Sequence, residues 1–194
     1  MSKLANGNEK INPVILGIDP GTIKMGFALV RFNKPLPVLL DYGTLNLKHI
    51  TDPHEKLHHI FVKIEQLTKK YEVHEFAIEA PFFGKNVQSM LKLGRAQGVA
   101  ISAAMYFGLK TSEYSPRKIK QSVAGNGNAS KEQVARMIEK QFGINLGDAS
   151  LDATDALSVA LCHAFCRDSV SGNAKTKDWS SFIKDNPGKL ISGK

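Results

Sequence analysis

The sequence predicts one α/β domain, in which a mixed five-stranded sheet has helices packed on its faces. Three observations lead to this fold class. A chain of 194 residues suits a single hydrophobic core. Its 42% hydrophobic and 23% charged residues are typical of soluble globular proteins, and its predicted elements begin with three strands and continue with alternating helices and strands. We place the domain at residues 13–166, between an N-terminal tail (1–12) and a basic C-terminal tail (167–194).

The first half of the chain is predicted to form a three-stranded meander, a helix and a fourth strand. The first three strands are expected at residues 14–19, 25–32 and 38–47. Proline and glycine separate these apolar runs by short connections, which favour antiparallel pairing. A helix is predicted from Asp52 to Tyr71, because Asp52 is a capping residue and Pro53 suits the first helical position. The fourth strand follows at residues 76–79.

The second half is predicted to contain one more strand and several helices. The expected elements are a helix at 87–107, a strand at 109–114, a helix ending near 142 and a helix at 151–165. Ser115-Pro116 is a second cap-plus-proline start, and Ser130 with Gln133 fits a capping box that opens the helix ending near 142. The resulting order is β-β-β-α-β-α-β-α-α, which is compatible with an RNase H-like fold.

The charge and composition of the chain indicate which kind of partner it binds and in which cellular compartment it works. The formal net charge of +8 favours a polyanionic partner. No window approaches the roughly 20 apolar residues that span a bilayer, and the N-terminus lacks the apolar stretch of a signal peptide, so we expect a cytoplasmic protein without membrane association. Cys162 and Cys166 lie in an apolar helical run, which predicts buried thiols and no disulfide framework.

Four acidic residues occupy positions that are unusual for structural carboxylates. Asp19 and Glu79 each end an apolar strand just before a proline-containing turn. Asp152 and Asp155 are three residues apart on an otherwise apolar helix, which places them on one face. Taken singly, Asp19 could be a turn residue and Asp152 a residue at a helix N-terminus. The four together favour a catalytic site.

Clustered carboxylates repel one another unless protonation or bound cations offset their charge. Two divalent cations about 3.5 to 4 Å apart activate water and neutralise a phosphate under attack, which is the chemistry of phosphodiester hydrolysis. Since the set contains only oxygen ligands, magnesium fits better than zinc, and we expect two Mg²⁺ ions with manganese as a substitute. The acids therefore predict a metal-dependent nuclease.

Four segments of the chain resemble the RuvC family of Holliday junction endonucleases, from about residue 14 to residue 165. They are Gly-Ile-Asp-Pro-Gly-Thr at 17–22, Ala-Ile-Glu-Ala-Pro-Phe at 77–82, Leu-Lys-Leu-Gly-Arg-Ala-Gln-Gly-Val-Ala at 91–100 and Asp-Ala-Thr-Asp-Ala-Leu at 152–157. The resemblance implies an RNase H-like fold, with Asp19, Glu79, Asp152 and Asp155 as the metal-binding catalytic acids. It also implies symmetrical nicking of two opposed strands of a four-way DNA junction by a homodimer, with RuvA and RuvB as branch-migration partners. We expect the helix at 87–107 to form much of the dimer interface.

The resemblance also implies a set of DNA-binding residues. Phe82 matches an aromatic residue that stacks on bases at the opened crossover. Lys120 and Lys131 match lysines at the active site or the substrate backbone, and Arg117 and Lys118 give Lys120 basic surroundings. Each of these residues also has a purely structural interpretation. Phe82 could be an ordinary core phenylalanine, and the basic residues could form a solvated charged face. The sequence departs from the commonest family pattern at the two residues after Glu79 and in its basic tail, which contains Trp179.

Three other functions share part of this pattern. An ATP-binding protein of the actin and sugar-kinase superfamily would have a similar first turn, but 194 residues leave no room for its second lobe. A non-catalytic junction-binding module would explain the basic charge and leave the acids unexplained. An RNA-processing nuclease of the YqgF group shares the first strand motif, but that group generally lacks the motif at residues 91–98.

His163 has two further interpretations. With Cys162 and Cys166 it suggests a zinc site, but a fourth ligand and the usual paired spacing are missing. We instead expect it near a helix C-terminus, where its charge is favoured. Because it lies two turns beyond Asp155, a secondary catalytic role stays open.

Overall fold

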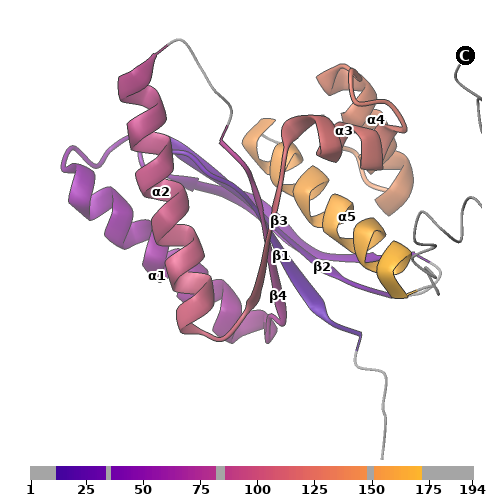
Figure 1. Ribbon diagram of the computed structural model, residues 1–194, viewed down its shortest axis with the longest axis horizontal. Coiled ribbons are helices and arrows are strands. Elements are labelled where there is room, and N and C mark those ends of the chain that lie inside the picture. The colour runs from indigo at the N-terminus through magenta and orange to yellow at the C-terminus, as the bar shows by residue number, and fades with distance from the viewer. Residues whose placement is uncertain (1–11, 34–35, 82–85, 148–150, 172–194) are drawn as a thin grey trace, which may run out of the picture.

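The computed structural model describes residues 12–33, 36–81, 86–147 and 151–171. Its centre is a five-stranded sheet with the strand order β3-β2-β1-β4-β5 (Figure 1). The strands are β1 (Val14–Asp19), β2 (Lys24–Arg31), β3 (Val38–Asn46), β4 (Glu75–Glu79) and β5 (Lys110–Tyr114). The predicted N-terminal meander is confirmed, because β1–β2 and β2–β3 pair antiparallel. β4 and β5 add parallel to β1, which completes the predicted mixed sheet.

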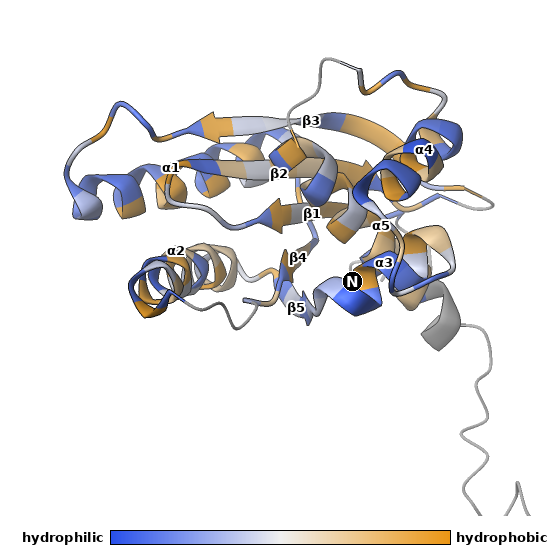
Figure 2. Cartoon of the chain, turned by 90° about the horizontal axis from the view of Figure 1, so that it is seen from above, coloured by the Kyte–Doolittle hydropathy of each residue, from blue (hydrophilic) through white to orange (hydrophobic). Residues whose placement is uncertain are grey.

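Among the described residues, five helices cover the two faces of the sheet (Figure 1). They are α1 (Pro53–Tyr71), α2 (Val87–Tyr106), α3 (Pro116–Ala124), α4 (Lys131–Phe142) and α5 (Leu151–Ser171). The first two pack on one face, and the last three lie on the other, as the view from above in Figure 2 also shows. Within the described ranges, no helix combines the length and the apolar character that crossing a bilayer requires.

Capping residues set the helix starts as the sequence predicts. The Asp52 carboxylate accepts hydrogen bonds from the backbone N–H groups of His54 and Glu55. Ser130 and Gln133 form the predicted capping box, in which each side chain accepts from the other residue's backbone N–H. The predicted element order is wrong in one respect: three helices follow β5 instead of two. Ser115, with its own cap contact to Lys118, opens the short helix α3 separately.

Helix α5 continues to Ser171, past the predicted end at residue 165 and into the segment expected to be tail. The extra turns carry Arg167, whose Nε donates to both carboxylate oxygens of Glu75 at 2.9 and 3.1 Å. Its guanidinium also lies 5.1 Å from the centre of the Phe32 ring. These contacts fix the helix to the sheet beyond the end of its apolar run. Residues 1–11 and 172–194, which hold most of both expected tails and Trp179, lie outside the described residues.

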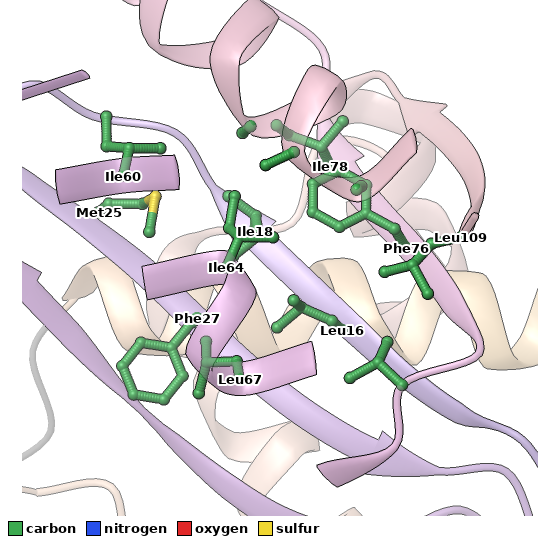
Figure 3. Close-up of a cluster of buried hydrophobic side chains, with 14 of the residues drawn as sticks. Leu16, Ile18, Met25, Phe27, Ile60, Ile64, Leu67, Phe76, Ile78 and Leu109 are labelled. Atoms are coloured by element: carbon green, nitrogen blue, oxygen red, sulfur yellow. The ribbon is translucent and has the colours of Figure 1, made fainter. Parts of the chain in front are cut away.

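The two faces of the sheet are built from different side chains because neighbouring residues of a strand point to opposite sides. The face under α1 and α2 presents large apolar residues, among them Leu16, Ile18 and Phe76 (Figure 3). Ile60, Ile64 and Leu67 of α1 pack against them. The opposite face also buries Ile15 and Val30, but it presents the small residues Ala28 and Ala77 to α5. This difference lets α5 approach the sheet closely, and the candidate active site depends on it.

Candidate active site

Two parallel strands bring the first pair of acids to the same edge of the sheet. Asp19 is the last residue of β1, and Glu79 is the last residue of β4. The strands pair in a register that sets Ile18 opposite Ile78, so the two carboxylates follow at neighbouring strand ends. Both acids alternate with residues that face α1 and α2, and therefore both lie on the α5 side of the sheet.

Helix α5 brings the second pair of acids to the same place. It lies against two strand glycines that leave no room for a side chain. A Cβ added at Gly17 would lie 2.6 Å from the backbone oxygen of Ala156, and one added at Gly26 would lie 1.9 Å from the backbone oxygen of Asp152. Gly26 pairs directly with Asp19 on the neighbouring strand. The first turn of α5 is thus held against the end of β1, and Asp155 follows one turn along the same helix face.

The electrostatics show that the four acids act on one another. Burial, followed by the negative charges of Glu79, Asp155 and Asp152, raises the pKa of Asp19 to about 8, although Lys131 lowers it. Burial and the charge of Asp155 raise the pKa of Glu79 to about 7. The site therefore holds carboxyl groups whose ionised forms are unfavourable without a compensating positive charge.

Two of the predicted DNA-binding lysines lie at these acids. Nζ of Lys131, the first residue of α4, forms a 2.8 Å ion pair with Oδ2 of Asp155. That hydrogen bond raises the pKa of Lys131, whose charge also lowers the pKa of Asp19 and of Glu79. Lys120 on α3 likewise lowers the pKa of Glu79. These two cations border the acidic site on the side of α3 and α4.

The structure does not bring the remaining predicted DNA contacts to the acids. Arg117 lies against Gly127 in the loop between α3 and α4. Lys118 is exposed, and its backbone oxygen faces the Cys162 thiol at 3.9 Å. Neither cation forms an ion pair with a residue of the described ranges. Phe82 lies outside the described residues.

The chemistry of the acids fits a hard divalent cation, but their positions do not form a closed ligand set. All four side chains offer carboxylate oxygen, the ligand that magnesium prefers. In the described part of the chain, no three His, Cys, Asp or Glu side chains are gathered closely enough to hold an ion. Repulsion among the acids and the ion pair between Asp155 and Lys131 both oppose a closer approach of the four carboxylates in the absence of a cation.

His163 belongs to a separate polar cluster at the other end of α5. Its Nε2 is 2.8 Å from Oε2 of Glu75, and its Nδ1 is 2.8 Å from the Tyr114 hydroxyl. Burial lowers the pKa of His163 despite the Glu75 carboxylate, which favours a neutral ring that donates to Glu75 and accepts from Tyr114. The expectation of a charged histidine near a helix C-terminus is therefore wrong, because α5 continues past it. Cys162 is buried as predicted, whereas Cys166 is only partly buried.

A cleft of about 750 Å³ adjoins the acids on the side of α1 and α2, and reasoning from the sequence missed it. Asp19 and Asp152 form part of its lining, together with the β1–β2 turn, the start of α1 and the first half of α2. The basic residues of the cleft are Lys24, Lys56, Lys92 and Arg95. They come from three separate elements, so no single stretch of sequence groups them. Only the spacing of Lys92 and Arg95 on one helix face signalled part of the cleft in advance.

Comparison with known proteins agrees with this architecture. The family model described as "Crossover junction endodeoxyribonuclease RuvC" matches residues 15–163. A protein of that name from Cytophaga hutchinsonii is 50% identical over 95% of this chain and 92% of its own length. One from Christiangramia forsetii is 46% identical over 93% of this chain and 94% of its own length.

Among solved structures, the chain is similar to "T. thermophilus RuvC in complex with Holliday junction substrate". The TM-score is 0.76 at 28% sequence identity, and the match covers 82% of this chain and 97% of that one. The predicted RNase H-like fold is thereby confirmed. This chain therefore belongs to the RuvC family of crossover junction endodeoxyribonucleases.

Proposed function

We propose that this protein is a metal-dependent endonuclease that resolves Holliday junctions by paired, symmetrical nicks in opposed DNA strands during recombination and repair. The observation that carries the proposal is the half-buried carboxyl group of Asp19, which has Glu79, Asp152 and Asp155 around it at the end of the sheet. Membership of the RuvC family supports the same activity, and the Thermus relative is described in complex with a Holliday junction substrate. An RNA-processing role is not favoured, because the family model and the curated relatives above all carry the RuvC name.

Within this proposal, the four acids hold two Mg²⁺ ions, for which Mn²⁺ substitutes. Bound divalent cations activate water for attack on a phosphodiester and offset the charge of the attacked phosphate and the leaving oxygen. The protein's own part is to orient the carboxylates: β1 and β4 present Asp19 and Glu79, and α5 presents the other two. Lys131 and Lys120 supply positive charge on the α3 and α4 side for the DNA backbone.

Two symmetrical cuts need two active sites, so we propose that the protein works as a homodimer. In this proposal the interface is the exposed apolar face of helix α2. Val87, Leu91 and Met105 are 65%, 56% and 65% exposed, and Gly94 and Gly98 between them have open space above their Cα atoms. Analytical ultracentrifugation at micromolar concentration should show a dimer, and Leu91→Glu should shift it to monomer. A wild-type protein that stays monomeric would contradict this proposal.

The cellular setting follows from family membership and is proposed with the function. We expect a cytoplasmic enzyme that meets its junction together with the branch-migration proteins RuvA and RuvB. Arg117 and Lys118 are proposed to extend the DNA contact along α3, and Phe82 is proposed to stack on bases at the crossover.

Cleavage of a labelled mobile four-way junction tests the proposal directly. Linear duplex and single strand serve as comparison substrates, with and without magnesium. We expect paired nicks in the junction alone, and loss of cutting in Asp19→Asn while that variant still binds. Binding without cutting, in magnesium and in manganese, would reduce the protein to a junction-binding module. Failure to bind the junction would contradict the proposal and favour an RNA substrate.

A further inference from the structure

Helix α1 begins with a pair of histidines that the proposed nuclease mechanism does not use. His54 and His58 are four residues apart in the segment His-Glu-Lys-Leu-His at 54–58, which lies wholly within the helix. Residues at this spacing lie on one helix face, with Cβ atoms about 5 to 6 Å apart. Zinc enzymes use the same spacing of two histidines on a helix, because both imidazoles then reach one ion. Of the six histidines in the chain, no other two are four residues apart.

Both imidazoles of this pair are accessible to an ion from solvent. The side chain of His54 is 87% exposed, and His58 is exposed as well. Two other histidines are engaged within the fold: Nδ1 of His74 accepts a hydrogen bond from the backbone N–H of Val14, and both ring nitrogens of His163 have partners. Exposure at α1 also leaves room for water molecules, which complete the coordination of an ion that only two side chains hold.

A carboxylate orients the first of the two rings. Oδ1 of Asp52, the capping residue of α1, lies 3.4 Å from Nδ1 of His54. This contact favours the tautomer with its hydrogen on Nδ1, which leaves the lone pair of Nε2 for a metal ion. Histidines that bind metals in proteins almost always have such a partner on the other ring nitrogen. The contact between Asp52 and His54 therefore points to a metal ligand independently of the histidine spacing.

The charges around the histidine pair suit a cation although they lie at a helix N-terminus. That end of a helix carries partial positive charge, which by itself disfavours a cation. Asp52 at the cap and Glu55 in the first turn supply two carboxylates there. Lys56 is the basic residue between the histidines, and its Nζ donates a 3.0 Å hydrogen bond to the backbone oxygen of Thr22. The two carboxylates thus offset the positive end of the helix.

We propose that His54 and His58 form a binding site for a divalent transition metal of the Zn²⁺ type, with Asp52 as the carboxylate that orients His54 and water as the remaining ligands. Imidazole nitrogen suits such ions, whereas Mg²⁺ prefers oxygen. The site is therefore chemically distinct from the four acids and does not depend on the proposed nuclease function. In the described ranges no third His, Cys, Asp or Glu completes a closed set. The site thus lacks the three protein ligands of a catalytic zinc centre.

Titration of the untagged, full-length protein with Zn²⁺ tests the site. Binding is measured by isothermal titration calorimetry in excess Mg²⁺, which competes for carboxylate sites and not for imidazole. The variants are His54→Gln, His58→Gln and Asp52→Asn. Asparagine remains a good capping residue, so the last variant removes the carboxylate and keeps the helix start. His59→Gln is the matched control, because His59 is exposed on the same helix but lies five residues from His54.

We expect the wild-type protein to bind one Zn²⁺ ion per chain at this site. Each of the substitutions His54→Gln and His58→Gln should weaken zinc binding roughly 100-fold, because it replaces chelation by two linked ligands with binding by one. Asp52→Asn should weaken it roughly tenfold, the effect of removing a group that orients a ligand. Saturating zinc should raise the melting temperature of the wild type and not of His58→Gln, since an ion that binds only the folded helix stabilises it.

The outcomes separate this site from the nuclease function. Unchanged zinc affinity in both histidine variants, or a wild-type protein that binds no zinc in excess Mg²⁺, would overturn the site and leave the nuclease function standing. A loss in His59→Gln as large as that in His54→Gln would overturn the assignment to this helix face. Loss of zinc binding in His54→Gln and His58→Gln alone would support the site, whether or not the protein cuts a junction.

Discussion

The two faces of the central sheet differ in how closely helices approach them, because the strand side chains on the two faces differ in size. Under α1 and α2 the strands present Leu16, Ile18 and Phe76, all fully buried. Under α5 they present Gly17 and Gly26, which touch the helix backbone with no side chain between. The large residues bury apolar area and stabilise the fold, whereas the glycines let a helix that carries two acids reach the strand that carries a third. The face under α5 therefore sets the geometry of the site in addition to burying apolar residues such as Ile15 and Leu157.

The largest effect on activity should come from filling the close contact at Gly26. In Gly26→Ala, the new Cβ would lie 1.9 Å from the backbone oxygen of Asp152, so the first turn of α5 must move away. A displacement of about 1 Å at a catalytic group can cost roughly 100-fold in rate, and we expect at least that loss in single-turnover junction cutting. Gly43→Ala on β3 is the matched control, since the atoms nearest to its Cβ belong to the Phe27 ring, at 3.1 Å or more, and not to a helix backbone. Equal cutting activity in Gly26→Ala and Gly43→Ala would show that the close contact with α5 does not control the site.

A large-to-small change on the other face should lower stability and spare the chemistry. Leu16→Ala leaves a cavity between the sheet and α1, and we expect a loss of about 2 to 5 kcal/mol in the free energy of unfolding, measured by urea denaturation. Cutting per folded molecule should stay close to wild type below the unfolding temperature. The control Val38→Ala, at a site 45% exposed, should change stability by less than about 0.5 kcal/mol. Loss of cutting in a folded Leu16→Ala protein would show that this face also controls the site.

Removing one acid should stabilise the metal-free protein at high pH. Asp19 has a pKa raised from 3.8 to about 8, so the folded state retains a proton that the unfolded state has lost. Stability should therefore fall as the pH rises from about 4 to 8. Asp19→Asn removes that penalty, and in EDTA at pH 9 we expect about 2 kcal/mol of added stability by thermal or urea unfolding. The gain should disappear near pH 4, and a constant difference across the pH range would argue against repulsion among the acids.

The smallest effect should come from the far end of α5. Hydrogen bonds from His163 and Arg167 hold the pKa of Glu75 below its usual value, even though burial alone would raise it. A carboxyl group with a lowered pKa contributes stability above its unfolded value of 4.5, and that contribution is lost as the pH falls through the folded pKa. Arg167→Gln should cost about 1 kcal/mol at pH 7 and progressively less as the pH falls below 4.5, measured by urea unfolding. Junction cutting should be unchanged, because this cluster lies apart from the acids.

Much of the candidate site could be predicted from the sequence because its signals are local. Asp19 and Glu79 end apolar strands before prolines, and the spacing of Asp152 and Asp155 sets them on one helix face. Other features gave no local signal. The Glu75 cluster joins residues far apart in the chain, from β4 and α5, and the continuation of α5 to Ser171 depends on those contacts.

What the sequence determined by itself is the set of elements: where strands end, where caps start helices, and which acids occupy those ends. These features depend on neighbours within a few residues, so periodicity, prolines and capping residues specify them. Tertiary structure alone decided the distances between elements. Only in the folded structure does α5 lie against Gly17 and Gly26, and only there does Lys131 form an ion pair with Asp155. The cations that line the cleft, Lys24, Lys92 and Arg95, likewise come together only in the fold. The physical reason is that close packing is a relation between surfaces, which a linear pattern of residues does not contain.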